Sequence, residues 1–132
     1  MGAADFLLGV CESWMTPALF LSVTFIAGAV ISFFTGSSWG TFAICIPIAV
    51  PMAYSFTGGQ LGTLVYAAVG AVVSGGLFGD HCSPVSDTSV LSSLGAACDH
   101  IDHVRTQLPY ALLAAAVSII LWVVVALVGG AV

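Results

Sequence analysis

The chain has 132 residues, of which 60% are hydrophobic and only 5% are charged, and its formal net charge is −5. A soluble domain carries roughly 25% charged residues, so this composition cannot cover a water-facing surface and predicts contact with the lipid bilayer. Arg105 is the single residue of the Lys and Arg type, which excludes a nucleic-acid partner because phosphate binding needs several cations.

Residues 1–16 predict an interfacial segment. Asp5 and Glu12 interrupt its apolar residues, and Trp14 stands where an aromatic side chain would sit at a membrane surface. No Lys or Arg precedes its apolar residues, so the segment does not resemble a secretory signal peptide. From Ser13 to Gly79 there is no ionisable Asp, Glu, Lys, Arg or His, and about 20 apolar residues are enough to cross a bilayer.

Residues 17–56 predict a helical hairpin that is broken at 35–41. Thr16 and Pro17 are a suitable N-cap and first-turn pair for the first helix. The apolar run that follows ends at small and hydroxyl-bearing residues, yet no charge stands in the break. An ordinary loop outside the membrane would often be charged, so the break is predicted to lie at membrane depth.

The second arm of this hairpin is predicted to be short and broken, because Pro47 and Pro51 interrupt it. Short segments interrupted by Gly or Pro mark binding sites in transporters, where protein or water satisfies the irregular backbone. The pattern therefore favours a re-entrant hairpin. Two ordinary spans joined by a tight external turn are the alternative.

Two further apolar runs predict transmembrane helices at 61–79 and 108–130. Small residues such as Gly70 and Ala71 permit close helix packing in the first of them. Both runs are free of ionisable residues, and the second is long enough to cross a bilayer with some tilt.

A polar segment at 80–106 separates these two runs. Pro84 disfavours helix at Ser83, and either Ser86 or Asp87 can cap a helix that starts near residue 88. The segment therefore predicts a helix, a break and a second helix. A break of this kind leaves free backbone carbonyl and N–H groups among hydroxyl-bearing side chains.

Oxygen ligands of this kind suit a hard cation such as Na⁺. Removing a carboxylate from water favours its neutral form, so a partly buried one can hold either H⁺ or Na⁺. Asp80 and Asp87 are the candidates, with Ser83 and Ser86 as further Na⁺ ligands. The alternative is that both carboxylates cap helices in a loop outside the membrane.

A second polar patch begins at Asp99. On a helix, Asp102 and His103 would share a face with Asp99, and carboxylates beside an imidazole can relay protons. The predicted relay therefore includes Asp80, Asp87, Asp99, Asp102 and His103. A charged interfacial connector before the last span is an equally weighted interpretation of the second patch.

Two other classes of site receive little support. Cys82, Cys98, His100 and His103 are possible zinc ligands, but their spacing matches no recognised zinc motif. The chain has no G-x-S-x-G nucleophile motif, so Ser-His-Asp hydrolysis is not expected. The protein is predicted not to be an enzyme.

Three segments resemble the NhaC family of Na⁺/H⁺ antiporters. They are FTGSSWGTF at 34–42, GDHCSPVSDT at 79–88 and CDHIDHV at 98–104, and the likeness continues to Tyr110. The resemblance implies an all-α, polytopic fold with a re-entrant hairpin and a broken helix, as in one inverted repeat of a secondary transporter. It also implies that both breaks line the transport site, at Thr35, Gly36, Ser37, Ser38, Thr41, Asp80, Ser83, Ser86, Asp87 and Thr88.

Members of that family are much longer and contain two repeats, whereas this chain resembles a C-terminal portion. The resemblance therefore implies a missing repeat or a second subunit as partner, a second copy of this chain being one form of it. The expected function is Na⁺/H⁺ antiport across the cytoplasmic membrane of a prokaryote, with no cofactor besides the transported ions. The alternatives are an organic-acid or amino-acid exchanger of the same fold, such as a malate/lactate exchanger, and a non-transporting assembly subunit.

Overall fold

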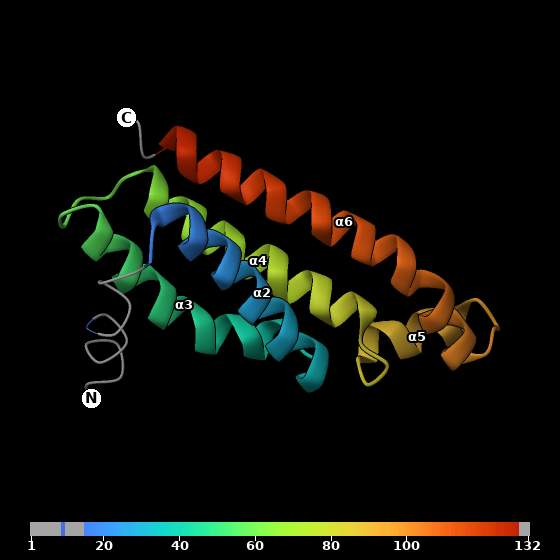
Figure 1. Ribbon diagram of the computed structural model, residues 1–132. Coiled ribbons are helices and arrows are strands. Elements are labelled where there is room, and N and C mark those ends of the chain that lie inside the picture. Colours follow the sequence, from blue (N-terminus) through green and yellow to red (C-terminus); the bar gives the residue numbers. More distant parts are fainter. Residues whose placement is uncertain (1–8, 10–14, 130–132) are drawn as a thin grey trace.

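The structure is a computed structural model that describes residue 9 and residues 15–129. Most of the predicted interfacial segment, residues 1–8 and 10–14, lies outside the described residues. The described part is all-helical, which confirms the all-α part of the predicted fold class, while the likeness to one inverted repeat stays a prediction (Figure 1). Its helices are α2 (Pro17–Thr35), α3 (Ser38–Phe56), α4 (Thr63–Cys82), α5 (Asp87–Gly95) and α6 (His100–Gly129).

Four of these helices are long and apolar enough to cross a membrane. Helices α2 and α3 have 19 residues each, α4 has 20 and α6 has 30. At about 1.5 Å per residue, 19 residues extend for about 28 Å, close to the hydrocarbon thickness of about 30 Å. Length and composition therefore agree with the predicted polytopic membrane protein.

The first break is shorter than predicted. Helix α2 ends at Thr35 and is capped by Gly36, whose φ of 67° is left-handed and whose amide donates to the Ser32 carbonyl at 2.8 Å. Ser37 then caps α3 by accepting a hydrogen bond from the Gly40 amide at 3.3 Å. The break is thus confined to residues 36–37, and residues 38–41 form the first turn of α3.

The prediction that prolines break the second arm is wrong. Helix α3 runs without interruption from Ser38 to Phe56 through Pro47 and Pro51. A proline in a helix removes one backbone N–H and crowds the carbonyl four residues earlier. Neighbouring helices and local adjustment accommodate such prolines in membrane helices, and α3 packs against α2 and α4. The re-entrant hairpin itself stays a prediction.

The second break lies between α4 and α5. Ser83 has an extended backbone (φ −72°, ψ 130°), as expected for a residue before Pro84. Ser86 caps α5 and accepts a hydrogen bond from the Thr88 amide at 3.2 Å. The predicted sequence of helix, break and helix is observed, and it places Asp80 in the last turn of α4.

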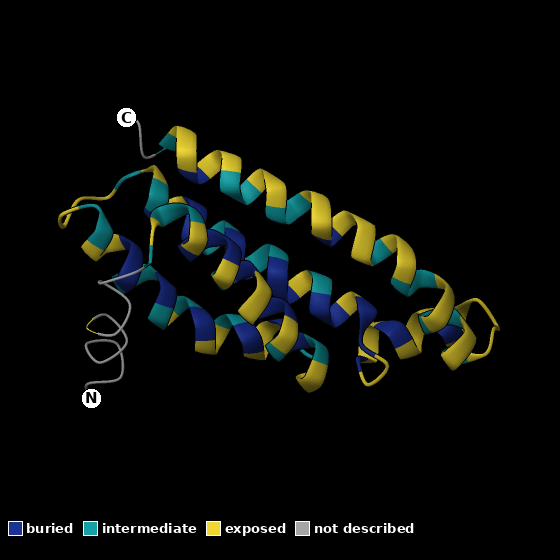
Figure 2. Cartoon of the chain, viewed as in Figure 1, coloured by how far each residue is buried: buried dark blue, intermediate teal, exposed yellow. Residues whose placement is uncertain are grey.

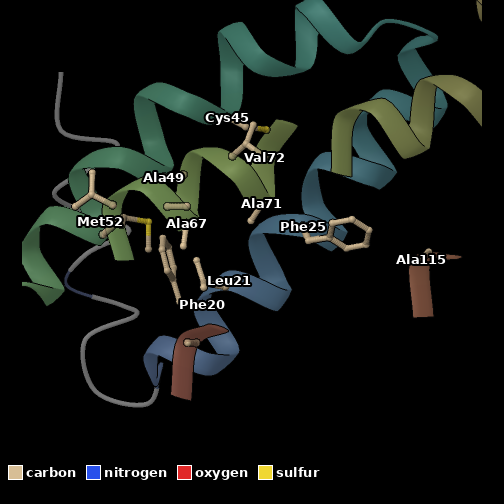
Figure 3. Packing of buried hydrophobic residues seen from close by; sticks show 14 residues of the cluster. Phe20, Leu21, Phe25, Cys45, Ala49, Met52, Ala67, Ala71, Val72 and Ala115 are labelled. Atoms are coloured by element: carbon tan, nitrogen blue, oxygen red, sulfur yellow. The ribbon is translucent and has the colours of Figure 1, made fainter. Parts of the chain in front are cut away.

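Helices α2, α3 and α4 pack together, and α6 lies along their side (Figure 1). Their buried residues face one another, whereas α6 is mostly exposed and buries only Ala115 and Ala126 (Figure 2). The core between the three packed helices is apolar (Figure 3). Its members include Phe20, Leu21, Phe25, Cys45, Ala49, Met52, Ala67, Ala71 and Val72.

Helices α2 and α4 touch backbone to backbone. A Cβ atom on Gly75 would overlap the carbonyl oxygen of Phe25, and one on Gly79 would overlap the carbonyl oxygen of Ala29. Glycine at both positions therefore allows an approach that no other residue permits. Close contacts of this kind stabilise helix pairs in membranes, where apolar side chains gain little from leaving lipid.

We expect Gly75→Ala to destabilise the protein by about 1–3 kcal/mol, because a backbone carbonyl cannot move aside as a side chain can. The measurement is thermal unfolding of the chain in detergent micelles. Gly95→Ala is the matched control, since a Cβ atom there would meet nothing within 4 Å. Equal stability of the two variants would contradict the predicted close contact.

Candidate ion-binding site

The two helix breaks lie against each other. A Cβ atom on Gly36 would lie 2.8 Å from the carbonyl oxygen of Val85, and its φ of 67° also favours glycine. The buried Ser83 hydroxyl crosses between the breaks and donates to the carbonyl oxygen of Phe33 at 2.6 Å. Residues 50 positions apart in the chain are thus joined at one end of the helix bundle.

Asp80 is buried where the breaks meet, with 7% of its surface exposed. The Ser38 hydroxyl, from the start of α3, donates to its Oδ2 at 3.2 Å. The Ser86 hydroxyl, from the second break, donates to its Oδ1 at 2.7 Å. One hydroxyl from each side therefore holds each carboxylate oxygen, and both of these partners are uncharged.

Four helix ends converge around this carboxylate. Ser38 and Ser86 belong to the N-terminal ends of α3 and α5, where exposed N–H groups carry partial positive charge. Gly36 and Asp80 belong to the C-terminal ends of α2 and α4, where carbonyl oxygens carry partial negative charge. The positive ends stabilise a carboxylate anion, and the carbonyl ends can stabilise a cation beside it.

A second layer of hydrogen bonds fixes the break that carries Ser86. The Thr88 and Ser86 hydroxyl oxygens lie 2.7 Å apart. The His100 ring connects α6 to the break, with Nε2 2.7 Å from the Pro84 carbonyl oxygen and Nδ1 3.1 Å from the Ser93 hydroxyl. Because a carbonyl oxygen only accepts, Nε2 carries the hydrogen.

The other residues predicted at the breaks have different surroundings. Thr35 is exposed, and Ser37 caps α3. Thr41 is fully buried, and its hydroxyl donates to the Ser37 carbonyl at 2.9 Å. Asp87 is exposed in the first turn of α5. The structure therefore gathers Ser38, Ser86 and Asp80, but not Asp87, into one buried cluster.

The residues of the predicted proton relay are not gathered at one place. Asp99 is exposed, and its Oδ1 accepts hydrogen bonds from the amides of Ile101 and Asp102, which caps α6. Asp102 is exposed in the first turn of that helix. His103 is half-buried and lines a pocket between α4, α5 and α6. Their part in proton transfer stays a prediction.

Ser32 is a residue that the sequence analysis did not single out. Its hydroxyl is fully buried and, among the described side chains, is the one buried polar atom without a hydrogen-bond partner. Its Cβ lies 2.8 Å from the place of a Cβ on Gly79, so it stands at the contact between α2 and α4. A hydroxyl one helical turn before the Gly36 break was the signal available in the sequence.

The zinc alternative lacks a ligand set. Over residues 9 and 15–129, no three His, Cys, Asp or Glu side chains gather closely enough to hold a metal ion. Cys82 is buried and Cys98 is exposed, and both are free thiols.

The sequence matches the model of the Na⁺/H⁺ antiporter family over residues 1–127. The chain belongs to this family. The NhaC resemblance is thereby confirmed, and the protein is a multi-pass membrane protein of a family of transporters, not of enzymes. Both helix breaks lie within the matched residues.

Similar proteins carry several names. An uncharacterised protein of Haemophilus influenzae is 51% identical over a stretch that covers 83% of this chain and 20% of that protein's length. The malate-2H⁺/Na⁺-lactate antiporter of Bacillus subtilis is 36% identical over 86% of the chain and 23% of its length. The Na⁺/H⁺ antiporter NhaC of Alkalihalophilus pseudofirmus is 32% identical over 94% of the chain and 26% of its length.

This antiporter-family chain thus spans about a fifth to a quarter of the length of the curated relatives it matches. No solved structure matches it.

We expect Ser83→Ala to destabilise the protein by about 1–3 kcal/mol, because the Phe33 carbonyl oxygen loses the buried Ser83 hydroxyl as its hydrogen-bond donor. Thermal unfolding in detergent measures the change. Ser118→Ala is the matched control, since the Ser118 hydroxyl is exposed and donates within its own helix. A Ser83 variant as stable as the control would show that this hydrogen bond does not hold the breaks together.

Proposed function

We propose that this chain is the part of a prokaryotic Na⁺/H⁺ antiporter of the cytoplasmic membrane that carries the carboxylate for which the two ions compete. That carboxylate is Asp80. The observation that supports the proposal is its burial where two helix breaks meet, with the hydroxyl of Ser38 from the start of α3 and that of Ser86 from the second break on its oxygens.

Competition follows from the energetics of a buried carboxylate. An unpaired charge away from water is costly, and the two hydroxyl partners do not neutralise it. Either a proton or a sodium ion removes that cost, but both together would leave an excess positive charge. One site therefore exchanges the two ions without needing a second carboxylate.

The ligand chemistry suits sodium. The two Asp80 oxygens and the hydroxyl oxygens of Ser38 and Ser86 are hard donors, and each hydroxyl already lies within hydrogen-bond distance of one carboxylate oxygen. A hard cation needs more oxygens than these. The remaining ligands come from backbone carbonyls at the breaks, and from the missing repeat in the longer polypeptide or in a second subunit.

Asp80 is preferred to Asp87 because of their different surroundings. Asp87 is exposed and lies in the first turn of α5, where an acidic residue stabilises the helix end. Water solvates such a carboxylate whether or not a cation is bound. Asp87 therefore contributes to the helix, and Asp80 to ion binding.

We expect Asp80→Asn to abolish Na⁺-dependent proton movement, since an amide neither carries the negative charge nor takes up the proton. Asp87→Asn should retain most of the wild-type rate. The assay is the collapse of a pH gradient on Na⁺ addition, in everted vesicles from cells without their own antiporters that express the chain with the missing repeat. In the wild type, the half-saturating Na⁺ concentration should rise as the pH falls.

Normal flux and normal pH dependence in the Asp80 variant would refute the carboxylate mechanism. Loss of flux in both variants would show that Asp80 and Asp87 act together, against the assignment to Asp80 alone. A wild type that moves neither ion would favour a non-transporting assembly subunit.

Exchange of organic acids or amino acids is the second candidate function. It is supported by the malate-2H⁺/Na⁺-lactate antiporter, which is 36% identical to this chain. We expect counterflow of labelled malate or lactate in proteoliposomes if the protein has this function. A pure cation antiporter would show Na⁺-dependent proton flux without counterflow of either acid.

A further inference from the structure

A polar pocket lies between α4, α5 and α6, beside the break that carries Ser86. Its volume is about 120 Å³. Since one water occupies about 30 Å³ in the liquid, the pocket has room for roughly four water molecules. Every lining side chain is polar and none is a carboxylate; they are His81, Thr88, Ser89, Ser92, His103 and Gln107.

A continuous chain of hydroxyl groups links this pocket to the buried carboxylate. The Thr88 hydroxyl, which lines the pocket, lies 2.7 Å from the Ser86 hydroxyl, and that hydroxyl lies 2.7 Å from Asp80 Oδ1. Because Ser86 has one hydroxyl hydrogen and donates it to the carboxylate, Thr88 is the donor to Ser86. All hydrogen bonds of the chain then point from the pocket towards Asp80.

Two imidazole side chains also line the pocket. His81 and His103 line it from α4 and α6, and imidazole is the side chain that takes up and releases protons near neutral pH. The carboxylates of Asp87, Asp99 and Asp102 are exposed and do not line it. Arg105 is likewise exposed and outside the lining.

We propose that this pocket supplies protons to Asp80 and receives them from it through the hydroxyl groups of Thr88 and Ser86. A hydronium or imidazolium ion in the pocket gives its proton to the Thr88 oxygen. Thr88 passes its original hydrogen to Ser86, and Ser86 passes its own to Asp80 Oδ1. One new O–H bond forms on each of Thr88, Ser86 and Asp80. The bond from the proton to its donor in the pocket breaks, as do the original O–H bonds of Thr88 and Ser86. One proton is therefore transferred, and both hydroxyls stay neutral.

The transfer reverses the direction of the hydrogen bonds that link Thr88, Ser86 and Asp80. After protonation, Asp80 donates to Ser86 and Ser86 donates to Thr88, which is the arrangement needed to return the proton to the pocket. The inference rests on the proposed ion exchange at Asp80. It adds that the proton reaches Asp80 Oδ1 from the α5 side, whereas Oδ2 accepts its hydrogen bond from Ser38 at the start of α3.

The simpler role of Thr88 is structural. Its amide donates to the Ser86 hydroxyl at 3.2 Å, and its own hydroxyl then only completes the cap of α5. In that case Thr88→Val would reduce every activity of the site equally. A proton relay predicts a different result, because Thr88 would then be needed for proton transfer but not for sodium binding.

The test compares two activities of the complete transporter in proteoliposomes. One is Na⁺/H⁺ antiport, and the other is exchange of labelled for unlabelled Na⁺, which moves no proton. We expect Thr88→Val to slow antiport by about a hundredfold, the lower end of the range for loss of a proton-transfer group, and to leave sodium exchange near the wild-type rate. Thr88→Ser, which keeps the hydroxyl, should restore antiport.

Thr106→Val is the matched control, because the exposed Thr106 hydroxyl bonds only to carbonyl oxygens of its own helix. It should leave both rates unchanged. A Thr88→Val protein with wild-type antiport, or with both rates reduced equally, overturns the relay. A wild type without either activity refutes the proposed function, and this inference with it.

A second variant keeps the inference testable if Thr88→Val does not fold. Replacing both pocket imidazoles, in His81→Gln/His103→Gln, leaves the hydroxyl chain intact. We expect slower antiport above pH 7, where free protons are scarce, with normal sodium exchange. Normal antiport at that pH in the double variant would overturn the role of the pocket.

Discussion

The carbonyl oxygens of Phe25 and Ala29 occupy the places where side chains would otherwise stand on Gly75 and Gly79. This contact sets the distance between α2 and α4, and with it the place where their C-terminal ends meet. The Gly36 break can reach the Val85 carbonyl only because those ends lie side by side. The hydroxyls of Ser83 and Ser86 then lie in register with Phe33 and Asp80.

A carboxylate at this position is stabilised by geometry rather than by opposite charge. Its partners are neutral hydroxyls and the N-terminal ends of two helices, so its negative charge is held but not cancelled. A salt bridge would neutralise the carboxylate, whereas the two hydroxyl partners leave its charge uncompensated. Arg105, the only Arg of the chain, is exposed on α6, and it forms no ion pair with Asp80.

Local patterns predicted the cap before the first helix and the break before Pro84. Thr16 with Pro17, and Ser83 before Pro84, are signals carried by adjacent residues, and the structure has the predicted cap and break there. Pro47 and Pro51 misled because tertiary packing overrides local propensity in α3. The choice between Asp80 and Asp87 depends on which carboxylate is buried, and burial depends on tertiary packing, so spacing alone could not decide it. The spacing of Ser32 could place it near the first break, but its lack of a hydrogen-bond partner depends on the neighbouring helix.

The pairing of α2 with α4 also has a mechanical consequence. Two helices joined backbone to backbone cannot slide or rotate against each other without a clash, so they form a rigid frame. Helix α6 is attached differently: the Trp122 ring covers Gly70, and a cavity of about 470 Å³ remains between α4 and α6. A large side chain can turn where a carbonyl cannot. A displacement of α6 against this frame therefore has to move side chains only, whereas a displacement of α2 against α4 has to separate two backbones.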